Sequence, residues 1–584
     1  MLFSILIKKK LTWKHLLPDL TCFASVFDQS CPPLFNPMAN LQTRLKEGLI
    51  QFCHSCSPSR FMLLKAPEED EYLYLIAETI KQMLPALDQP IGSRYVMTAM
   101  GISEQPATTI EDNFAARETC VWQSWAEHEQ IFGAMRCYKD VIDLQPGLVH
   151  RANGGILIIG VHSLVNNPIL WRRLKRMILH QRFDWLPPYA SCSLPISVPS
   201  MPLDLRLIVV GSREGLASLS DLEPNLNCLA QYGEFDSELH IAGKKEMKQW
   251  CVWVSTLARR YELPLLSNDA WYTLVRQAVR YSGDQCKLPL CPQWLIRRMK
   301  EAMLYSSKQT LTASAFTESD RIKIWCESYF RECMQSEIAE GQIMVKSEGY
   351  VVGQVNALSV LDVPGYPLSF GQPSRISCVV HLGNGEINDI ERKAELGGNL
   401  HAKGMMIMQA FLMSVLKLEQ PLPFSASLVF EQSYDEVDGD SASLAEVGAL
   451  ISALADKPIN QQIAVTGSID QFGHVQPIGG VNEKIEGFFA LCQARGLTGA
   501  HGVIIPTKNV RHLCLHDDVI KAVRANQFSL WAVDTIDEAL AILTSMPFNN
   551  EKLPSLIASI RERIANVNLH ERKRFPWGLR WLNI

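Results

Sequence analysis

Short, mostly apolar runs alternate with longer helical patterns through the first half of this chain. The runs cover Phe61–Leu64, Gly155–Ile159 and Leu205–Gly211, and each has the length of a strand that is buried on both faces. Helical patterns cover Glu68–Met83 and Pro168–Arg182. Buried strands that alternate with helices predict an α/β domain, built on a parallel sheet with helices on its faces.

The chain has 584 residues, which is too long for a single hydrophobic core. Its texture changes after the first α/β pattern, to an all-helical region and then to a mixture of strands and helices. The sequence predicts five parts: an irregular segment 1–40, a parallel-sheet α/β domain 41–245, a helical subdomain 246–340, a mixed α/β domain 345–546 and a basic, aromatic tail 547–584.

The mixed α/β domain has its own predicted elements. Strands are predicted at Tyr350–Val360, Arg375–Leu382, Ser425–Glu431, Gln462–Ser468, Gly502–Pro506 and Ser529–Val533. Helices are predicted at Leu400–Leu418, Ser441–Ala455 and Asn482–Arg495.

Composition excludes several classes of protein. The longest apolar stretches, Gly154–Leu164 and Gly404–Leu416, are shorter than the roughly 20 residues that a spanning helix needs. The 16 scattered cysteines and the lack of an export signal predict reduced thiols and a cytoplasmic location. The pair Cys53 and Cys56 lacks the further ligands of a zinc site. A net charge of −5 gives no general affinity for nucleic acid, and we expect no DNA or membrane partner.

One segment with a candidate catalytic serine joins an apolar strand to an Ala/Leu-rich helix. It reads Asp438-Gly439-Asp440-Ser441-Ala442-Ser443, so Ser441 is expected at a helix N-terminus. Unsatisfied backbone N–H groups there could bind the oxyanion of a tetrahedral intermediate. Taken alone, the segment is more typical of an N-cap serine after a turn.

A second segment places a lysine in the first turn of a helix. The run Pro477-Ile478-Gly479-Gly480-Val481-Asn482-Glu483-Lys484 follows the pair Thr466-Gly467. The helix dipole and burial would both lower the pKa of Lys484. A neutral lysine can take the proton of a serine hydroxyl, which is the serine–lysine form of nucleophilic catalysis. A surface lysine is the plainer interpretation of this residue alone.

Together the two segments resemble the proteolytic domain of the Lon protease family, and most of all its archaeal-type and related bacterial branches. The shared residues are GDSA around Ser441, the pair Thr466-Gly467 and the run PIGGVNEK that ends at Lys484. The resemblance implies that Ser441 is the nucleophile and Lys484 the general base. It also implies that Thr466 hydrogen-bonds the lysine and that Asp438 is an acidic residue of the active-site loop. His401, His474 and His512 are the alternative bases, and none lies in a recognised partner motif.

Lon proteases join this domain to an ATPase of the AAA+ class, which residues Gly147–Gly155 and Arg213–Ala217 resemble in outline. A phosphate-binding loop needs glycines followed by Lys and Ser or Thr, but the expected turn Lys65–Glu71 reads KAPEEDE. The strand that should end in a magnesium-holding acid continues instead as Gly160-Val161. We therefore expect a degenerate AAA+-like domain, with no cofactor and no metal.

The sequence thus predicts a Lon-like serine endopeptidase that cleaves unfolded proteins or peptides without hydrolysing ATP. The resemblance implies a homo-oligomer, a hexameric ring. Two alternatives stay open at this point. One is an ATP-dependent Lon-type protease with a non-standard nucleotide site, and the other is a non-catalytic assembly or chaperone protein.

Overall fold

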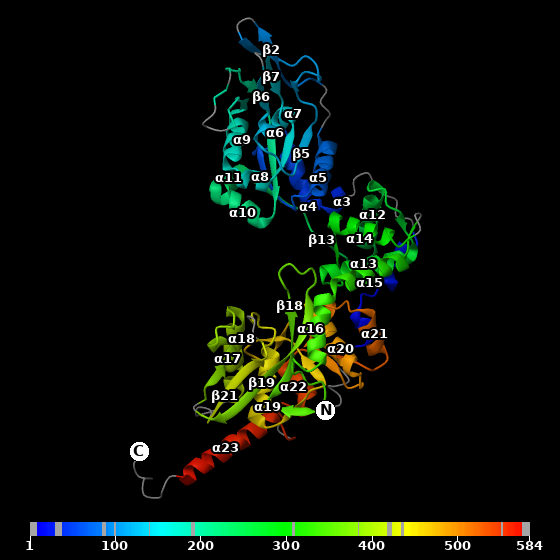
Figure 1. Cartoon of the computed structure of the whole chain (residues 1–584), viewed down its shortest axis with the longest axis vertical. Helices are drawn as coiled ribbons and strands as arrows, with labels where there is room; N and C mark the ends of the chain where they lie inside the picture. The colour runs from blue at the N-terminus through cyan, green and yellow to red at the C-terminus, as the bar shows by residue number, and fades with distance from the viewer. Residues whose placement is uncertain are drawn as a thin grey trace, which may run out of the picture. The chain divides into compact units, whose positions relative to one another are not determined.

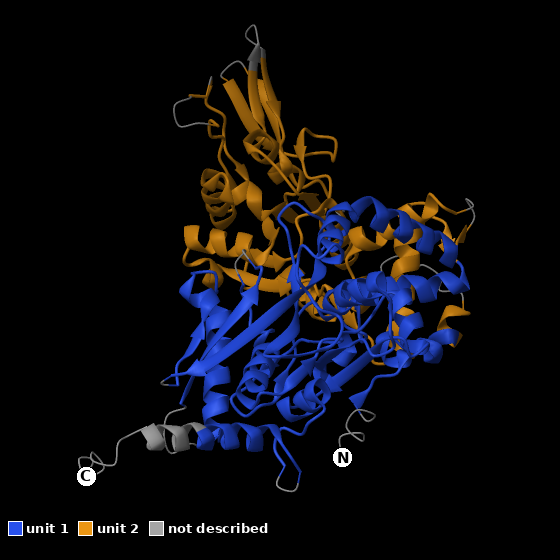
Figure 2. Cartoon of the chain, turned by 60° about the horizontal axis from the view of Figure 1, so that its bottom comes forward, with its two compact units in different colours: residues 1–24, 267–288, 312–584 blue, residues 25–266, 289–311 orange. Residues whose placement is uncertain are grey.

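The chain forms two compact units in a computed structural model, and Figure 2 draws them in different colours. Unit 1 comprises residues 1–24, 267–288 and 312–584, and unit 2 comprises residues 25–266 and 289–311. The structure describes residues 9–29, 38–84, 89–98, 101–138, 141–188, 193–194, 196–306, 310–383, 385–416, 423–433, 437–550 and 553–574.

Unit 2 is built on a five-stranded parallel sheet with the order β12-β1-β11-β8-β5. Its strands are β1 (Phe61–Lys65), β5 (Cys120–Gln123), β8 (Ile156–Gly160), β11 (Arg206–Gly211) and β12 (Ala230–Glu234). The three predicted apolar runs form β1, β11 and β8, which lie side by side at the centre of the sheet. The predicted α/β class of this half of the chain is therefore confirmed.

Helices and short antiparallel strands complete unit 2 (Figure 1). The helices include α4 (Thr43–Cys53), α5 (Asp70–Met83), α8 (Val161–Val165), α9 (Pro168–His180), α10 (Arg213–Leu222), α12 (Lys244–Arg260) and α14 (Pro292–Met303). The antiparallel strands include β2 (Gly92–Thr98), β3 (Gly101–Pro106), β4 (Phe114–Ala115), β6 (Ala134–Tyr138) and β7 (Val141–Gln145). The sequence predicted helix to Arg182, but Gln181 takes a left-handed conformation with φ 52° and ends α9 at His180.

Unit 1 contains a seven-stranded mixed sheet with the order β20-β21-β19-β18-β23-β26-β27. Strands β18 (Gln354–Leu361), β19 (Phe370–Leu382) and β21 (Phe424–Glu431) pair antiparallel. Strands β18, β23 (Ile463–Val465), β26 (Gly502–Pro506) and β27 (Ser529–Val533) pair parallel. The edge strand β20 (Ile387–Asp389) is parallel to β21. The predicted mixed α/β class of this part is confirmed.

Two hydrophobic cores cover the two faces of this sheet. Neighbouring residues of one strand point into different cores: Ile504 of β26 joins the first core, whereas Val503 and Ile505 join the second. The first core is closed by α18 (Asn399–Leu416), α19 (Ser443–Ala455), α22 (Ile536–Thr544) and α23 (Leu556–Arg574). The second is closed by α20 (Val481–Arg495), α21 (Asp517–Arg524) and residues of α16 (Tyr329–Ala339).

The helical region is shared between the two units. Helices α13 (Asn268–Ser282), α15 (Ala313–Glu327) and α16 belong to unit 1, whereas α12 and α14 belong to unit 2. The limits of the five predicted parts stay predictions. No helix among the described residues is both long enough and apolar enough to cross a membrane.

The N-terminal segment packs on unit 1 where it is described. Lys9 Nζ lies 2.7 Å from a carboxylate oxygen of Asp534, and Leu11 N–H donates to the Leu530 carbonyl at the edge strand β27. Residues 1–8 and 30–37 of the predicted irregular segment, and residues 575–584 of the predicted tail, lie outside the described residues.

A backbone-to-backbone contact fixes α20 against β19. A Cβ atom on Gly371 would lie 1.9 Å from the carbonyl oxygen of Glu483, and one on Gly487 would lie 2.1 Å from the carbonyl oxygen of Gly371. Only glycine leaves room for so close an approach. The two glycines therefore set the distance between β19 and the helix that carries Lys484.

Gly487→Ala should destabilise unit 1 because the new methyl group overlaps the Gly371 carbonyl oxygen. The expected loss is roughly 1–3 kcal/mol, as for overpacked sites, and it is measured from the midpoint of urea unfolding. The matched control is Gly448→Ala in α19, where the nearest atom to the new Cβ is Leu543 Cδ1 at an ordinary 3.6 Å. That control should be neutral or stabilising by up to about 1 kcal/mol. Equal effects of the two substitutions would show that the close approach does not matter.

Candidate active site

Ser441 lies in a tight turn between β21 and α19. Gly439 has φ +126°, a conformation that other residues rarely adopt, so the chain can reverse just before the serine. The sequence predicted that Ser441 begins the helix, but α19 starts at Ser443 and has Ala442 as its N-cap. The reason is that Ser443 directs both its N–H and its hydroxyl to the carbonyl of Asp440, which closes a turn first.

The helix N-terminus does not offer the predicted free N–H groups. The N–H groups of residues 443–446 already donate to the carbonyls of Asp440, Gly467 and Ala442. The N–H groups of Ser441 and Ala442 have no acceptor among the described residues. Any oxyanion site near the serine would therefore use these two turn amides rather than the first turn of α19.

Lys484 reaches Ser441 from the opposite face of the sheet. Its Nζ lies 2.8 Å from Ser441 Oγ and 3.3 Å from Thr466 Oγ1. The lysine is only 3% exposed, and the described residues give its amine no carboxylate within ion-pair distance. Two hydroxyls are thus its contacts.

Burial governs the charge of this amine. It lowers the pKa of Lys484 from its ordinary 10.5 to about 8, while the nearby Asp440 carboxylate acts in the opposite direction. A substantial fraction of Lys484 is therefore neutral in mildly alkaline solution. In that form the amine can accept the proton of the Ser441 hydroxyl.

Thr466 sits directly after β23 and is fully buried. Its N–H donates to the Ile504 carbonyl of the neighbouring β26, and its hydroxyl lies 3.4 Å from the Ser441 carbonyl oxygen. Gly467 N–H also donates to that carbonyl, at 2.9 Å. The end of β23 thereby holds the serine turn beside the lysine amine, and both hydroxyls named by the sequence meet the same Nζ.

The two aspartates of the turn have different places. Asp438 is exposed and accepts a hydrogen bond from Leu400 N–H at 3.2 Å, so it anchors the start of α18. Asp440 accepts a hydrogen bond from the Ser468 hydroxyl at 2.8 Å and acts electrostatically on Lys484. Sequence reasoning singled out Asp438 and missed Asp440, although its position next to Ser441 was a usable signal.

The three candidate histidines lie elsewhere. His401 is buried, and its Nε2 lies 3.1 Å from Asp389. Its Nδ1 lies 3.4 Å from Glu446, whose pKa burial raises to about 7. His474 pairs with Asp470, and His512 Nδ1 lies 3.1 Å from Asn509 Nδ2. Among the described residues, none of these histidines forms a hydrogen bond with Ser441.

Arg280 of α13 holds the helix that carries Lys484. Its guanidinium donates two hydrogen bonds of 2.8 Å to Glu486 and one of 2.7 Å to Glu483. It also donates to the Cys514 carbonyl at 2.9 Å. Such a bidentate contact fixes orientation as well as position. No sequence pattern pointed to Arg280, because it lies about 200 residues before its partners.

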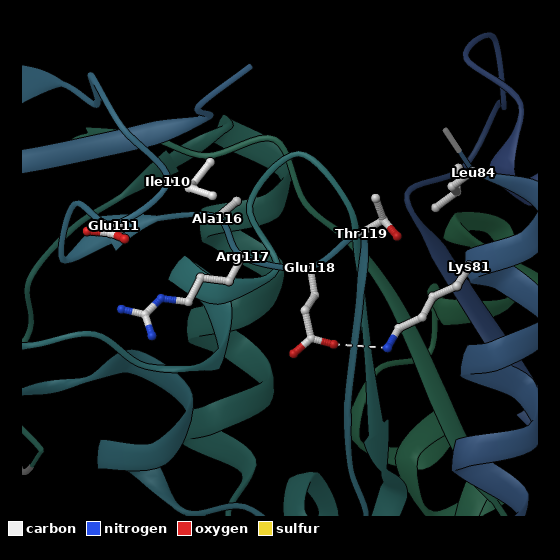
Figure 3. Close-up of a pocket in the computed structure, with 8 residues that line it drawn as sticks. All are labelled: Lys81, Leu84, Ile110, Glu111, Ala116, Arg117, Glu118 and Thr119. Atoms are coloured by element: carbon white, nitrogen blue, oxygen red, sulfur yellow. Dashed lines mark hydrogen bonds and ion pairs between the residues drawn. The ribbon is translucent and has the colours of Figure 1, made fainter. Parts of the chain in front are cut away.

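In the described part of the chain, no group of three or more His, Cys, Asp or Glu residues could hold a metal ion. A cavity of about 850 Å³ opens in unit 2, beside Lys81, Arg117 and Glu118 (Figure 3). Lys81 Nζ pairs with Glu118 across it at 2.9 Å. The cavity lies near the start of β5 and the end of α5, so it is not at the carboxyl edge of the sheet, where such sheets bind nucleotides.

Two family models match the chain. The first, described as a LonB-like AAA domain, matches residues 125–232. The second, described as the Lon protease (S16) C-terminal proteolytic domain, matches residues 435–545. The second match contains Ser441, Thr466 and Lys484.

The chain is also similar to curated proteins along its length. A Lon protease homolog of Escherichia coli (strain K12) is 51% identical over 580 residues, which are 98% of each chain. A Lon protease homolog of Haemophilus influenzae is 40% identical over 586 residues, 97% of this chain and 96% of that protein. An archaeal Lon protease of Thermococcus kodakarensis is 26% identical over 437 residues, 72% of this chain and 64% of that protein.

The reactivity of Ser441 should follow the neutral fraction of Lys484. We expect a fluorophosphonate probe to label Ser441 at a rate that rises about tenfold per pH unit at low pH and levels off above a midpoint near the Lys484 pKa of about 8. Mass spectrometry of the labelled peptide measures the rate, and Ser441→Ala is the blank. A midpoint near about 6.5 would instead indicate a histidine base.

Proposed function

The chain belongs to the Lon protease family, and from that premise we propose that it is a serine endopeptidase with Ser441 as nucleophile and Lys484 as general base. The match to the Lon proteolytic domain supports a peptidase. The observation that carries the finer proposal is the 2.8 Å approach of a buried lysine amine to the Ser441 hydroxyl. A lysine in such a place serves best as a proton acceptor.

Acylation follows from these positions. Ser441 Oγ attacks the carbonyl carbon of a peptide bond while neutral Lys484 Nζ takes the hydroxyl proton. The negative charge of the tetrahedral intermediate falls on the substrate oxygen, and the amides of Ser441 and Ala442 are the proposed donors to it. The intermediate collapses when Lys484 gives its proton to the leaving amine, which departs and leaves an ester on Ser441.

Deacylation uses the same base. Lys484, neutral again, takes a proton from water, and the resulting hydroxide attacks the ester carbonyl. When the second tetrahedral intermediate collapses, the proton returns to Ser441 Oγ and the carboxylic acid product leaves. Thr466 Oγ1, 3.3 Å from Nζ, serves as a positioning residue that holds the amine toward the serine.

The proposed substrates are unfolded proteins and peptides. We infer a homo-oligomer, a ring of this chain, from family membership. The proposal includes hydrolysis without ATP, because Lys65–Glu71 lacks the glycines and the Lys-Ser/Thr pair of a phosphate-binding loop.

Ser441→Ala and Lys484→Met should each abolish casein hydrolysis, because one removes the nucleophile and the other keeps the side-chain bulk without the base. The expected loss in rate is roughly 10³-fold or more, as for removal of a triad member. Lys521→Ala, at a lysine whose side chain is 76% exposed, is the matched control. Wild-type rates in either site variant would rule out the pair. If the unaltered protein fails to cleave casein and also leaves the fluorophosphonate probe unreacted, the assembly or chaperone class is favoured.

Magnesium-ATP should leave the casein rate of the wild-type protein unchanged, because the turn after β1 offers no phosphate cradle. The measurement is peptide release with ATP, with ADP and without nucleotide, together with phosphate release in the same tubes. Stimulation of proteolysis accompanied by phosphate release would establish an ATP-dependent protease with a non-standard nucleotide site.

A further inference from the structure

The turn between β1 and α5 places a carboxylate at the carboxyl edge of the parallel sheet of unit 2. Glu68 lies in this turn, and its side chain is only 14% exposed. One carboxylate oxygen accepts the backbone N–H of His162 at 3.0 Å, and the other lies 2.6 Å from His162 Nδ1. His162 is the second residue of α8, the helix that follows β8 directly. Glu68 therefore joins the ends of β1 and β8, two strands that are not neighbours in the sheet.

Two glycines make room for this carboxylate. A Cβ atom on Gly160 would lie 2.7 Å from one Glu68 carboxylate oxygen, and one on Gly211 would lie 3.3 Å from the other. Gly160 ends β8 and Gly211 ends β11. The carboxylate therefore lies among the ends of β1, β8 and β11.

In P-loop proteins the same turn after the first strand cradles phosphate, with backbone N–H groups and a lysine as donors. A nucleotide of that kind does not fit here, because a chain carboxylate stands in the turn. Two basic side chains at this edge also form ion pairs with a glutamate of the chain. Lys65 Nζ lies 3.1 Å from Glu234, and Arg213 donates to Glu234 at 2.9 Å.

We propose that the Glu68 carboxylate is a built-in anion that takes the place of a nucleotide phosphate and ties the turn after β1 to the ends of β8 and β11. A bound nucleotide holds these elements together only while it is present. Glu68 holds them together permanently, so unit 2 keeps one arrangement independently of nucleotide. This inference does not depend on the peptidase chemistry, since its tests do not involve Ser441.

The first test is the thermal unfolding of the full-length wild-type protein with magnesium-ATP, and separately with inorganic pyrophosphate, at millimolar concentration. The expected unfolding temperature equals that of the protein alone, because a ligand stabilises only the state that it binds. A saturable upward shift with either probe would overturn the proposal.

The second test compares two charge-neutralising substitutions in the same acidic run. Glu68→Gln removes the enclosed charge and should lower the unfolding temperature by about 2–4 °C. Asp70→Asn removes an exposed charge and should change it by less than about 1 °C. Equal shifts would overturn the proposal, because the acidic run would then act only through its total charge.

A double-mutant cycle with His162→Ala keeps the proposal testable if Glu68→Gln is poorly folded at high temperature. Both substitutions remove part of one contact, so the combined shift in the midpoint of urea unfolding at low temperature should be smaller than the sum of the single shifts. Strictly additive shifts would show that Glu68 does not act through His162 and would overturn the proposal.

Discussion

The candidate active site of unit 1 depends on the burial of the Lys484 amine. A charged ammonium at the position of Lys484 Nζ would lose its hydration and gain two hydroxyl contacts but no touching carboxylate, so the neutral form is favoured. The surrounding features serve this placement. The glycine contact between β19 and α20 fixes the distance between that strand and the helix, and the end of β23 supplies Thr466. Arg280 forms ion pairs with the two glutamates of α20 that lie on either side of the lysine in sequence.

Much of this arrangement could be predicted from the sequence because it depends on local patterns. The apolar runs at 61–64, 155–159 and 205–211 form central strands of a parallel sheet, where burial on both faces leaves Arg206, at the start of β11, as the only charged residue in the three runs. The run that ends at Lys484 begins a helix, as its two glycines indicate, and the structure brings that lysine to Ser441. The roles of the two residues stay proposals.

The parts that could not be predicted depend on contacts distant in the sequence or on edges of sheets. Strands β2, β3, β6 and β7 mix polar and apolar residues because they lie outside the central sheet, so no apolar run marks them. Helix α19 begins two residues later than predicted, because the Ser443 hydroxyl donates to the Asp440 carbonyl and closes a turn there. The place of Asp438 depends on its hydrogen bond with the start of α18. Arg280 contacts α20 only in the folded chain.

The placement of α13 has a consequence for how this polypeptide can be divided. Arg276 pairs with Asp517, and Arg280 pairs with Glu483 and Glu486. Residues 267–288 therefore belong to unit 1, although residues 289–311 of unit 2 separate them in sequence from residues 312–584. A fragment that starts after residue 311 would retain every residue proposed to act on a peptide bond. It would nevertheless leave three acids without their guanidinium partners. Unit 1 is therefore discontinuous in sequence, and a single cut of the chain does not separate it from unit 2.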